Sequence, residues 1–436
     1  MAGVYGGYWV SKQKTDDVYG VSRDIPLNYV VRENVDGKLI NDLTLDKHVI
    51  IYGSSKQGKT SLRKHCLDED DYILVQCQNR WGLEKLADAI LKEAGFKVEI
   101  SEQRTVENKQ KIIAKVSAKL KTLGFAETQS ELEANIERGI TTSKLMQPIE
   151  LDPSDPNDLV NALEAIGFDK YIVLEDFHYL PQDTQEGYAF FLKTVHERSN
   201  ICFIVVAVWR EENRLILLNG DLSGRVVSVD ADEWTPEELR TVIEDGEKLL
   251  NIRFEEDFKV ELIQKSLGSV YIVQDSCLRA CKVASVHRTE DQLATLKLDR
   301  NAESFISEVV AESGPRYSAF LTSFASGFQD TTLEMYKWLL YPILTAETSD
   351  LEKGIGYRQI RETLEEVHPT GKDLNAGNVT QALAAIPALQ SKKKIKPFVL
   401  DYDQANKRLS VVDRGFLIWL STQNIDEQLL ELGLNR

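Results

Sequence analysis

Residues 53–61 read GSSKQGKTS, and this short segment constrains the fold more than any other part of the chain. Its spacing, a Gly, four residues, a Gly, a Lys and then Ser or Thr, is the pattern of a phosphate-binding loop. An apolar run at His48–Tyr52 precedes it and predicts a buried strand, while residues 60–67 can begin a helix. Strand, glycine-containing loop and helix in this order predict an α/β fold on a mostly parallel sheet with helices on both faces.

The loop predicts that the chain binds a nucleoside triphosphate together with Mg²⁺. Two glycines let the backbone curve so that successive N–H groups point at a phosphate, and the next helix adds its positive N-terminal end. Lys59 can reach the β- and γ-phosphates, and the hydroxyl of Thr60 is placed to hold Mg²⁺. The predicted phosphate-binding residues are Gly53, Ser54, Ser55, Lys56, Gln57, Gly58, Lys59, Thr60 and Ser61.

Hydrolysis also needs acidic groups opposite the loop, and the apolar run YIVLED at residues 171–176 ends in two of them. Taken in order, Glu175 would serve Mg²⁺ and Asp176 the attacking water. Asp followed by Glu is the more usual order, so the two roles can also be exchanged. His178 follows closely and is either a phosphate sensor or a packed loop histidine.

Arg225 ends the segment NGDLSGR, just before a short predicted strand. An arginine there can stabilise the charge of a transferring phosphoryl group, in its own chain or in a neighbouring subunit, and a structural salt bridge is the alternative. After the buried strand at residues 201–208, Arg210 and Asn213 are further candidates for sensing the γ-phosphate.

The order of patterns along the chain predicts four parts. Three helices without an intervening strand follow the predicted sheet and form a lid. Further on, three helices and a hairpin at residues 396–402 and 407–412 have the order of a winged helix. The predicted parts are an N-terminal approach segment at 1–45, a P-loop core at 46–234 with a polar helical insertion at about 99–157, the lid at 235–312 and the winged-helix domain at 313–436.

Composition and charge narrow the function classes. No apolar run is long enough to span a bilayer, and the first residues lack the apolar core of a secretory signal, so we expect a cytoplasmic protein without a membrane partner. Five cysteines, an odd number, indicate reduced thiols. The net charge of −17 argues against a general nucleic-acid coat. The guanine-reading pattern Asn-Lys-x-Asp is absent, which favours ATP over GTP.

Together, the loop, the strands YIVLED and ICFIVVAV, the SGR ending at Arg225, the lid and the winged helix resemble the AAA+ and STAND P-loop ATPases, especially their origin-recognition and NLR-like branch. The resemblance spans about residues 25–420 and implies ATP and Mg²⁺ as cofactors. It assigns Tyr29 and Arg32 to contact with the adenine ring. At residues 268–271, GSVY, the proline or arginine of many members is absent. The phrases VLEDFHYL and NGDLSGR are similar to bacterial ATPases of anti-phage defence systems.

Two functional hypotheses follow. In the first, the chain is an ATPase switch, with turnover that can be slow, and nucleotide rearranges the winged helix to change homo-oligomerisation or engagement of a separate effector protein. In the second, it is a DNA-binding protein that uses ATP as a structural ligand. The predicted recognition helix at residues 375–390 contains no Lys or Arg, which favours protein contacts. Asn378, Gln381 and the basic run at 391–396 leave DNA open.

Overall fold

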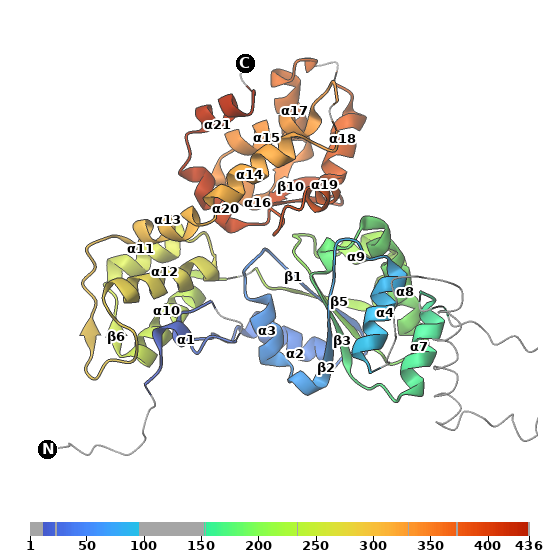
Figure 1. Ribbon diagram of the computed structural model, residues 1–436, viewed down its shortest axis with the longest axis horizontal. Helices are drawn as coiled ribbons and strands as arrows, with labels where there is room; N and C mark the ends of the chain where they lie inside the picture. The colour runs from blue at the N-terminus through green and yellow to red at the C-terminus, as the bar shows by residue number, and fades with distance from the viewer. Residues whose placement is uncertain are drawn as a thin grey trace, which may run out of the picture.

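Figure 1 shows the computed structural model of the chain, which describes residues 12–21, 24–95, 152, 154–232, 234–329, 331–371 and 374–434. Most of the predicted insertion at about 99–157 lies outside these residues. Helix α7 (Pro156–Ala165) begins near residue 157, the predicted end of the insertion. Asp155 caps this helix by accepting the N–H of Asn157. In the described parts of the chain no helix has the length and apolar character needed to cross a bilayer.

A five-stranded sheet forms the centre of the first body of the molecule. Its strands lie in the order β2-β3-β4-β1-β5, and all neighbours pair in parallel. Each strand is built around a short apolar run that contains Val or Ile. They are β1 (His48–Tyr52), β2 (Tyr72–Gln76), β3 (Tyr171–Glu175), β4 (Phe203–Val206) and β5 (Val226–Asp230).

Helices cover both faces of this sheet, which confirms the predicted α/β fold. Ile50 and Val205 point into a core on one face, whereas Val49 and Ile51 point into a separate core on the other face. This alternation explains why β1 is buried at every position and carries the apolar run at residues 49–51. The first face is covered by α4 (Leu83–Glu93), α7 and α8 (Gln182–Arg198), and the second by α2 (Lys38–Leu43) and α3 (Lys59–Cys66).

A helical lid follows the sheet. Its first helix starts where the sequence predicts, because Thr235 and Glu238 form a reciprocal capping box. Helix α1 (Thr15–Val18) of the N-terminal segment packs into the lid, and the hydroxyl of Tyr19 donates to the carbonyl of Ile243 at 2.6 Å. The lid comprises α10 (Pro236–Leu250), α11 (Glu256–Lys265), α12 (Val270–Val283), α13 (Ala302–Ala311) and the paired short strands β6 (Ile252–Arg253) and β7 (Ala294–Thr295).

In the C-terminal region, residues 314–434, helices precede a hairpin, and the winged-helix assignment stays a prediction. This region has a three-stranded antiparallel sheet with the order β8-β10-β9. Its elements are α14 (Gly314–Ala325), α15 (Met335–Thr345), α16 (Thr348–Lys353), β8 (Ile355–Gly356), α17 (Tyr357–Val367), α18 (Ala376–Ala384), α19 (Ile386–Lys392), β9 (Leu400–Asp403), β10 (Arg408–Val411), α20 (Arg414–Ser421) and α21 (Ile425–Glu431).

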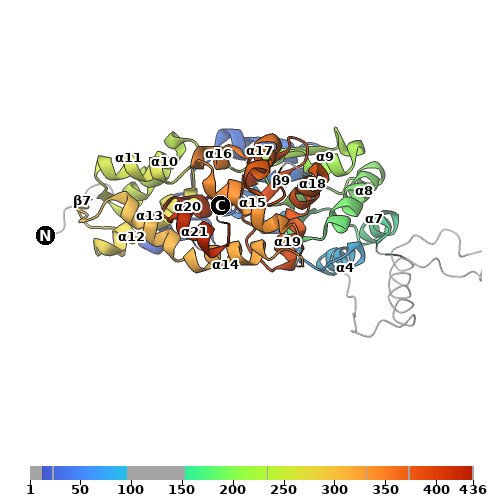
Figure 2. The same ribbon diagram turned by 90° about the horizontal axis from the view of Figure 1, so that it is seen from above.

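The predicted recognition helix differs from the structure in one respect. It is split at Ala385 into α18 and α19, because Pro387 lacks the N–H that would continue the ladder and occupies the first turn of the new helix. Figures 1 and 2 place the whole C-terminal region above the junction between the sheet and the lid.

Candidate functional site

The predicted phosphate-binding loop lies between the carboxyl end of β1 and the start of α3. Gly53 and Gly58 have φ angles of 136° and 83°, which side chains disfavour. A Cβ atom at Gly53 would also come within 3.1 Å of the amide nitrogen of Asp232. Helix α3 starts at Lys59, so its free N-terminal amides border the loop and form an anion-binding end.

Lys59 is held inside the loop as a buried cation. It is 9% exposed, and its Nζ donates to the carbonyls of Gly53 at 3.0 Å and Ser54 at 2.5 Å. Burial lowers the pKa of Lys59 to about 8, against the opposing effect of nearby carboxylates led by Asp232. A phosphate group beside this ammonium would favour its charged form, so the lysine fits a phosphate ligand.

The two residues predicted to hold Mg²⁺ meet across the loop. Oγ1 of Thr60 donates to Oε1 of Glu175 at 2.8 Å, and Oε2 of Glu175 lies 3.5 Å from Nε of the buried Arg63. Within the described residues, no cluster of three or more His, Cys, Asp or Glu could hold a metal ion by itself. Thr60 and Glu175 therefore fit Mg²⁺ that also binds phosphate oxygens and water.

Asp176 follows β3 in a left-handed backbone conformation, with φ of 58°. Its half-buried carboxylate accepts a hydrogen bond from Nε2 of Gln76 at the end of the neighbouring strand. Burial, then the negative charge of Glu175, raises the pKa of Asp176. Both acids thus line the site, and the one with the raised pKa is suited to accept a proton.

A cavity of about 320 Å³ extends from the loop to the N-terminal segment and the lid. Residues 55–61 line one end together with both acids, whereas Gly53 and Ser54 of the loop are not among the lining residues. The other end is mostly apolar, with a few polar groups. A cavity of this construction fits a nucleotide whose phosphates lie on the loop. The residues of the apolar end include Pro26, Asn28, Tyr29, Val30, Val242, Val270 and Gln274.

The two predicted adenine contacts occupy different places. Tyr29 lines the cavity, and its hydroxyl donates to Oδ1 of Asp36 at 2.6 Å. Arg32 is 2% exposed and lies outside the cavity lining, where it donates to the carbonyl of Ala231 at 3.2 Å and stacks 4.0 Å over the ring of Trp234. The structure thus gives Arg32 a supporting place behind the site.

Asn28 and Gln274 line the cavity but escaped the sequence analysis. They lie 246 positions apart and carry no motif. Two signals pointed toward them: the resemblance placed the segment at residues 25–32, which contains Asn28, at the adenine ring, and it placed residues 268–271, three positions before Gln274, near the nucleotide.

Arg225 lies at the end of the sheet opposite the loop. Its carbonyl accepts the N–H of His48, the first residue of β1, and its guanidinium pairs with Glu197 at 2.8 Å. The five residues of β1 separate this position from the loop, a distance of roughly 16 Å at the usual rise of a strand. Within its own chain Arg225 cannot reach a γ-phosphate, which leaves contact with a neighbouring subunit or the structural ion pair.

The remaining candidate residues are not among those that line the nucleotide cavity. Nδ1 of the buried His178 accepts the N–H of Val208 at 3.2 Å, and its ring packs edge-on against Phe398 at 5.3 Å, as expected of a packed histidine. Asn213 precedes α9 (Arg214–Leu218) and lies outside the cavity lining. Arg210 stands behind the loop, where NH1 pairs with Asp232 at 2.6 Å and lies 3.5 Å from Oγ of Ser54.

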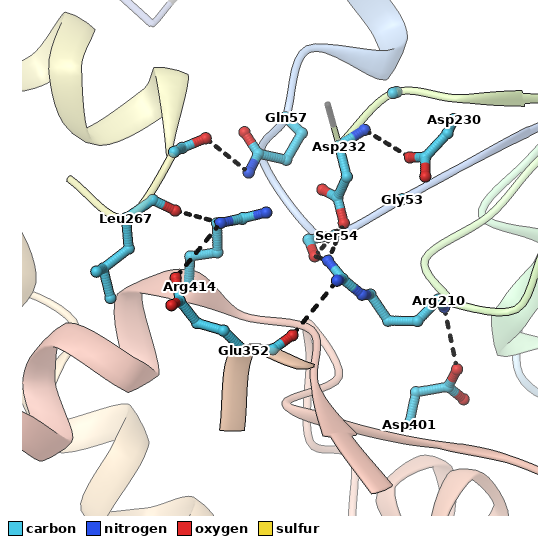
Figure 3. A network of polar contacts seen from close by, with 12 residues as sticks. Gly53, Ser54, Gln57, Arg210, Asp230, Asp232, Leu267, Glu352, Asp401 and Arg414 are labelled. Atoms are coloured by element: carbon cyan, nitrogen blue, oxygen red, sulfur yellow. Dashed lines mark hydrogen bonds and ion pairs between the residues drawn. The ribbon is translucent and has the colours of Figure 1, made fainter. Parts of the chain in front are cut away.

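The C-terminal region closes over the loop. The backbone N–H of Ser55 donates to the carbonyl of Val412 at 3.0 Å, directly after β10. Asp401 of β9 accepts the N–H of Arg210 at 3.2 Å and pairs with Arg214 at 2.7 Å. Figure 3 shows that Arg210 also reaches the carbonyl of Glu352, at 3.4 Å. One amide of the phosphate-binding loop is therefore already engaged by the C-terminal region.

The lid joins the same junction. Nε2 of Gln57 donates to the carbonyl of Gly268 at 3.3 Å, and the indole of Trp234 donates to the carbonyl of Gln57 at 3.3 Å. Arg414 of α20 donates to the carbonyl of Leu267, as Figure 3 shows. Core, lid and C-terminal region thus meet at the loop.

No family model and no curated protein matches this chain. Among solved structures, a Walker-type ATPase of Pyrococcus abyssi aligns with 92% of this chain and 99% of its own, with a TM-score of 0.52 and 11% identity. The ORC1 protein of Aeropyrum pernix in complex with DNA aligns with 96% of this chain and 98% of its own, with a TM-score of 0.44 and 12% identity. The first similarity shows that the chain has the fold of a Walker-type ATPase.

Proposed function

We propose that this chain is an ATP-binding and ATP-hydrolysing switch, in which nucleotide on the loop competes with docking of the C-terminal region. The hydrogen bond from Ser55 to the carbonyl of Val412 carries the proposal. An N–H group that donates to this carbonyl is not free for a phosphate oxygen, and the partial negative charge of the carbonyl opposes an anion beside it. Because the two ligands of the loop exclude each other, nucleotide would shift the equilibrium toward an undocked state.

The residues of the site can be given roles in hydrolysis. Bound Mg²⁺ would supply positive charge to the phosphate oxygens, and Thr60 and Glu175 would hold it. Lys59 would orient the terminal phosphates. Asp176, whose pKa burial raises, would orient the attacking water and accept its proton, with Gln76 holding the carboxylate in place.

Arg225 suggests how copies of the chain would cooperate. It lies at the far end of the sheet, partly exposed, so the role predicted from the sequence requires a neighbouring subunit. We therefore propose that undocking of the C-terminal region allows a homo-oligomer, in which Arg225 of one copy serves the loop of the next. A separate effector protein, and a place in anti-phage defence, rest on the sequence resemblance alone.

The contacts of the C-terminal region favour a switch over a DNA-binding protein. Ala384, Pro387, Ala388 and Ser391, on and just before α19, line a cavity of about 660 Å³ that faces the ATPase core. Two lysines of the basic run are engaged within the chain: Lys392 donates to the carbonyl of Phe328, and Lys393 donates to Ser326. Helix α19 thus lies across a cavity from the ATPase core, whereas Gln381 of α18, a possible base reader, is exposed.

The proposal is tested by calorimetric titration of ATP and Mg²⁺ into the wild type, Lys59→Ala and the control Lys92→Ala, whose lysine is exposed on α4. We expect Lys59→Ala to weaken ATP binding at least about 100-fold, because a buried cation that faces phosphate is lost. Hydrogen exchange of residues 53–61 and 408–412 should change together when ATP binds. The switch would be refuted by equal ATP affinity for all three proteins, or by hydrogen exchange at residues 408–412 that ATP does not change.

A further inference from the structure

Two buried amide side chains face each other at the apolar end of the nucleotide cavity. Asn28 is 1% exposed and Gln274 is 7% exposed, and both line the cavity. Nδ2 of Asn28 donates to Oε1 of Gln274 at 3.0 Å, and Nε2 of Gln274 donates back to Oδ1 of Asn28 at 2.8 Å. Polar groups in a pocket that is otherwise apolar are the ones that orient its ligand.

A backbone carbonyl fixes the orientation of both side-chain amides. Nδ2 of Asn28 also donates to the carbonyl of Val242 at 2.9 Å, and a carbonyl can only accept. A rotated Asn28 would place its oxygen against that carbonyl, so the nitrogen must face Val242. Since Asn28 cannot rotate, Gln274 cannot rotate either: its oxygen must face Nδ2 of Asn28 and its nitrogen must face Oδ1. The hydrogen bonds that run from Val242 through Asn28 to Gln274 thus fix the orientation of the Gln274 amide.

A count of donors and acceptors shows what the locked amide can still offer. Both N–H groups of Asn28 are used. Gln274 has two donors and two acceptor positions, of which one each is used by the residues that the structure describes. One lone pair on Oε1 and one N–H remain, and they cannot exchange places. A locked acceptor distinguishes bases, since adenine carries a donor at N6 where guanine carries the acceptor O6.

We infer that Asn28 and Gln274 form an adenine-reading pair. In this pair Oε1 of Gln274 accepts a hydrogen bond from the 6-amino group of ATP, and Asn28 positions Gln274. This inference rests on the proposed binding of nucleotide in the same cavity. Guanine would set O6 against Oε1 and leave two desolvated acceptors unpaired, which a site built for hydrogen bonding rejects strongly. Because Val242 lies on α10 and Gln274 on α12, the same contact would join the base to the lid.

The test combines protein variants with a ligand that lacks the group in question. Affinities for ATP, GTP and purine riboside triphosphate, which has hydrogen in place of the 6-amino group, are measured for the wild type and Gln274→Leu. The wild type should bind ATP about 10- to 100-fold more tightly than purine riboside triphosphate. In Gln274→Leu, which keeps size but loses the acceptor, the two ligands should bind within about 2-fold, because the interaction is already gone. Gln182→Leu on the exposed side of α8 is the matched control and should keep the wild-type ratio.

Asn28→Asp tests the lock separately, because Asp cannot donate to Val242 or Gln274 and so frees Gln274 to rotate. The ATP to GTP affinity ratio should fall at least about 10-fold, while Lys59→Ala should weaken both nucleotides without changing the ratio. If the wild type binds ATP and its purine analogue equally, the adenine-reading pair is refuted although nucleotide binding stands. If the wild type binds no nucleotide at all, the proposed function itself fails. The analogue comparison on the wild type decides the inference even where a variant does not fold.

Discussion

Asp401 offers a direct way to undock the C-terminal region without touching the nucleotide cavity. Asp401 is 4% exposed, and its carboxylate holds two groups of the ATPase core, the N–H of Arg210 at 3.2 Å and the guanidinium of Arg214 at 2.7 Å. Asp401→Asn keeps the volume of the side chain but removes its charge. In the docked state Arg214 then lacks its counter-ion, whereas in the undocked state water can solvate it.

The size of the effect follows from these contacts. Hydrogen bonds to charged groups contribute about 1.5 to 3 kcal/mol each, and breaking a buried ion pair costs more. The side chain of Arg214 is 17% exposed, so water recovers part of its loss. We therefore expect Asp401→Asn to destabilise the docked state by about 2 to 3 kcal/mol, which lowers the docking equilibrium constant about 30- to 150-fold.

The assay is hydrogen exchange at the amide of Ser55, combined with ATP titration. In Asp401→Asn, hydrogen exchange at Ser55 should accelerate by up to about 30- to 150-fold, the factor by which the docking equilibrium constant falls. ATP should also bind more tightly, since apparent affinity rises with the fraction of molecules whose loop is free. Glu362→Gln is the control, because among the described residues Glu362 pairs with Arg358 on the exposed face of α17. Faster exchange at Ser55 with unchanged or weaker ATP binding would refute competition between Val412 and nucleotide.

Further predictions concern turnover, pH and assembly. Asp176→Asn should keep ATP binding but lower phosphate release at least about 100-fold, and a wild-type rate would rule out Asp176 as the base. Burial and the neighbouring Asp403 raise the pKa of Glu211 to about 7, above its unfolded value near 4.3. The folded protein therefore binds the extra proton, so the melting temperature should fall as pH rises from about 5 to 8, and Glu211→Gln should flatten this dependence. Mixing inactive Arg225→Ala with inactive Lys59→Ala should restore ATPase activity if Arg225 acts between subunits, whereas no recovery would leave only its ion pair with Glu197.

The sheet could be predicted because its strands are encoded locally. β1 and β3 are short runs rich in β-branched residues; β1 has its predicted bounds, and β3 ends at Glu175, one residue before its predicted end. The loop was equally predictable, since its glycine spacing permits few other conformations. Thr60 and Glu175 meet because the carboxyl ends of parallel strands share one edge of the sheet.

The rest of the site depends on contacts between distant segments. The bond from Ser55 to Val412 joins two backbone groups, which any sequence supplies, so no residue type could indicate it. Asn28 and Gln274 are ordinary amides that gain their meaning only where the lid meets the N-terminal segment. For Arg32, the position that the sequence resemblance implied and the position in the structure differ. The resemblance gave it a position near the nucleotide, but Trp234 and the carbonyl of Ala231 hold its guanidinium behind the site.

Successive positions of the loop are engaged by different parts of the molecule. Ser54 bonds to Asp232 of the core at 2.6 Å, Ser55 bonds to the C-terminal region, and Gln57 bonds to the lid. A ligand that rearranges the loop must therefore act on all three at once. The coupling is reciprocal: if nucleotide raises the affinity of the released region for a partner by some factor, then that partner raises nucleotide affinity by the same factor. An effector protein would thus need no contact with the nucleotide to control it, because holding the carbonyl of Val412 away from Ser55 is enough.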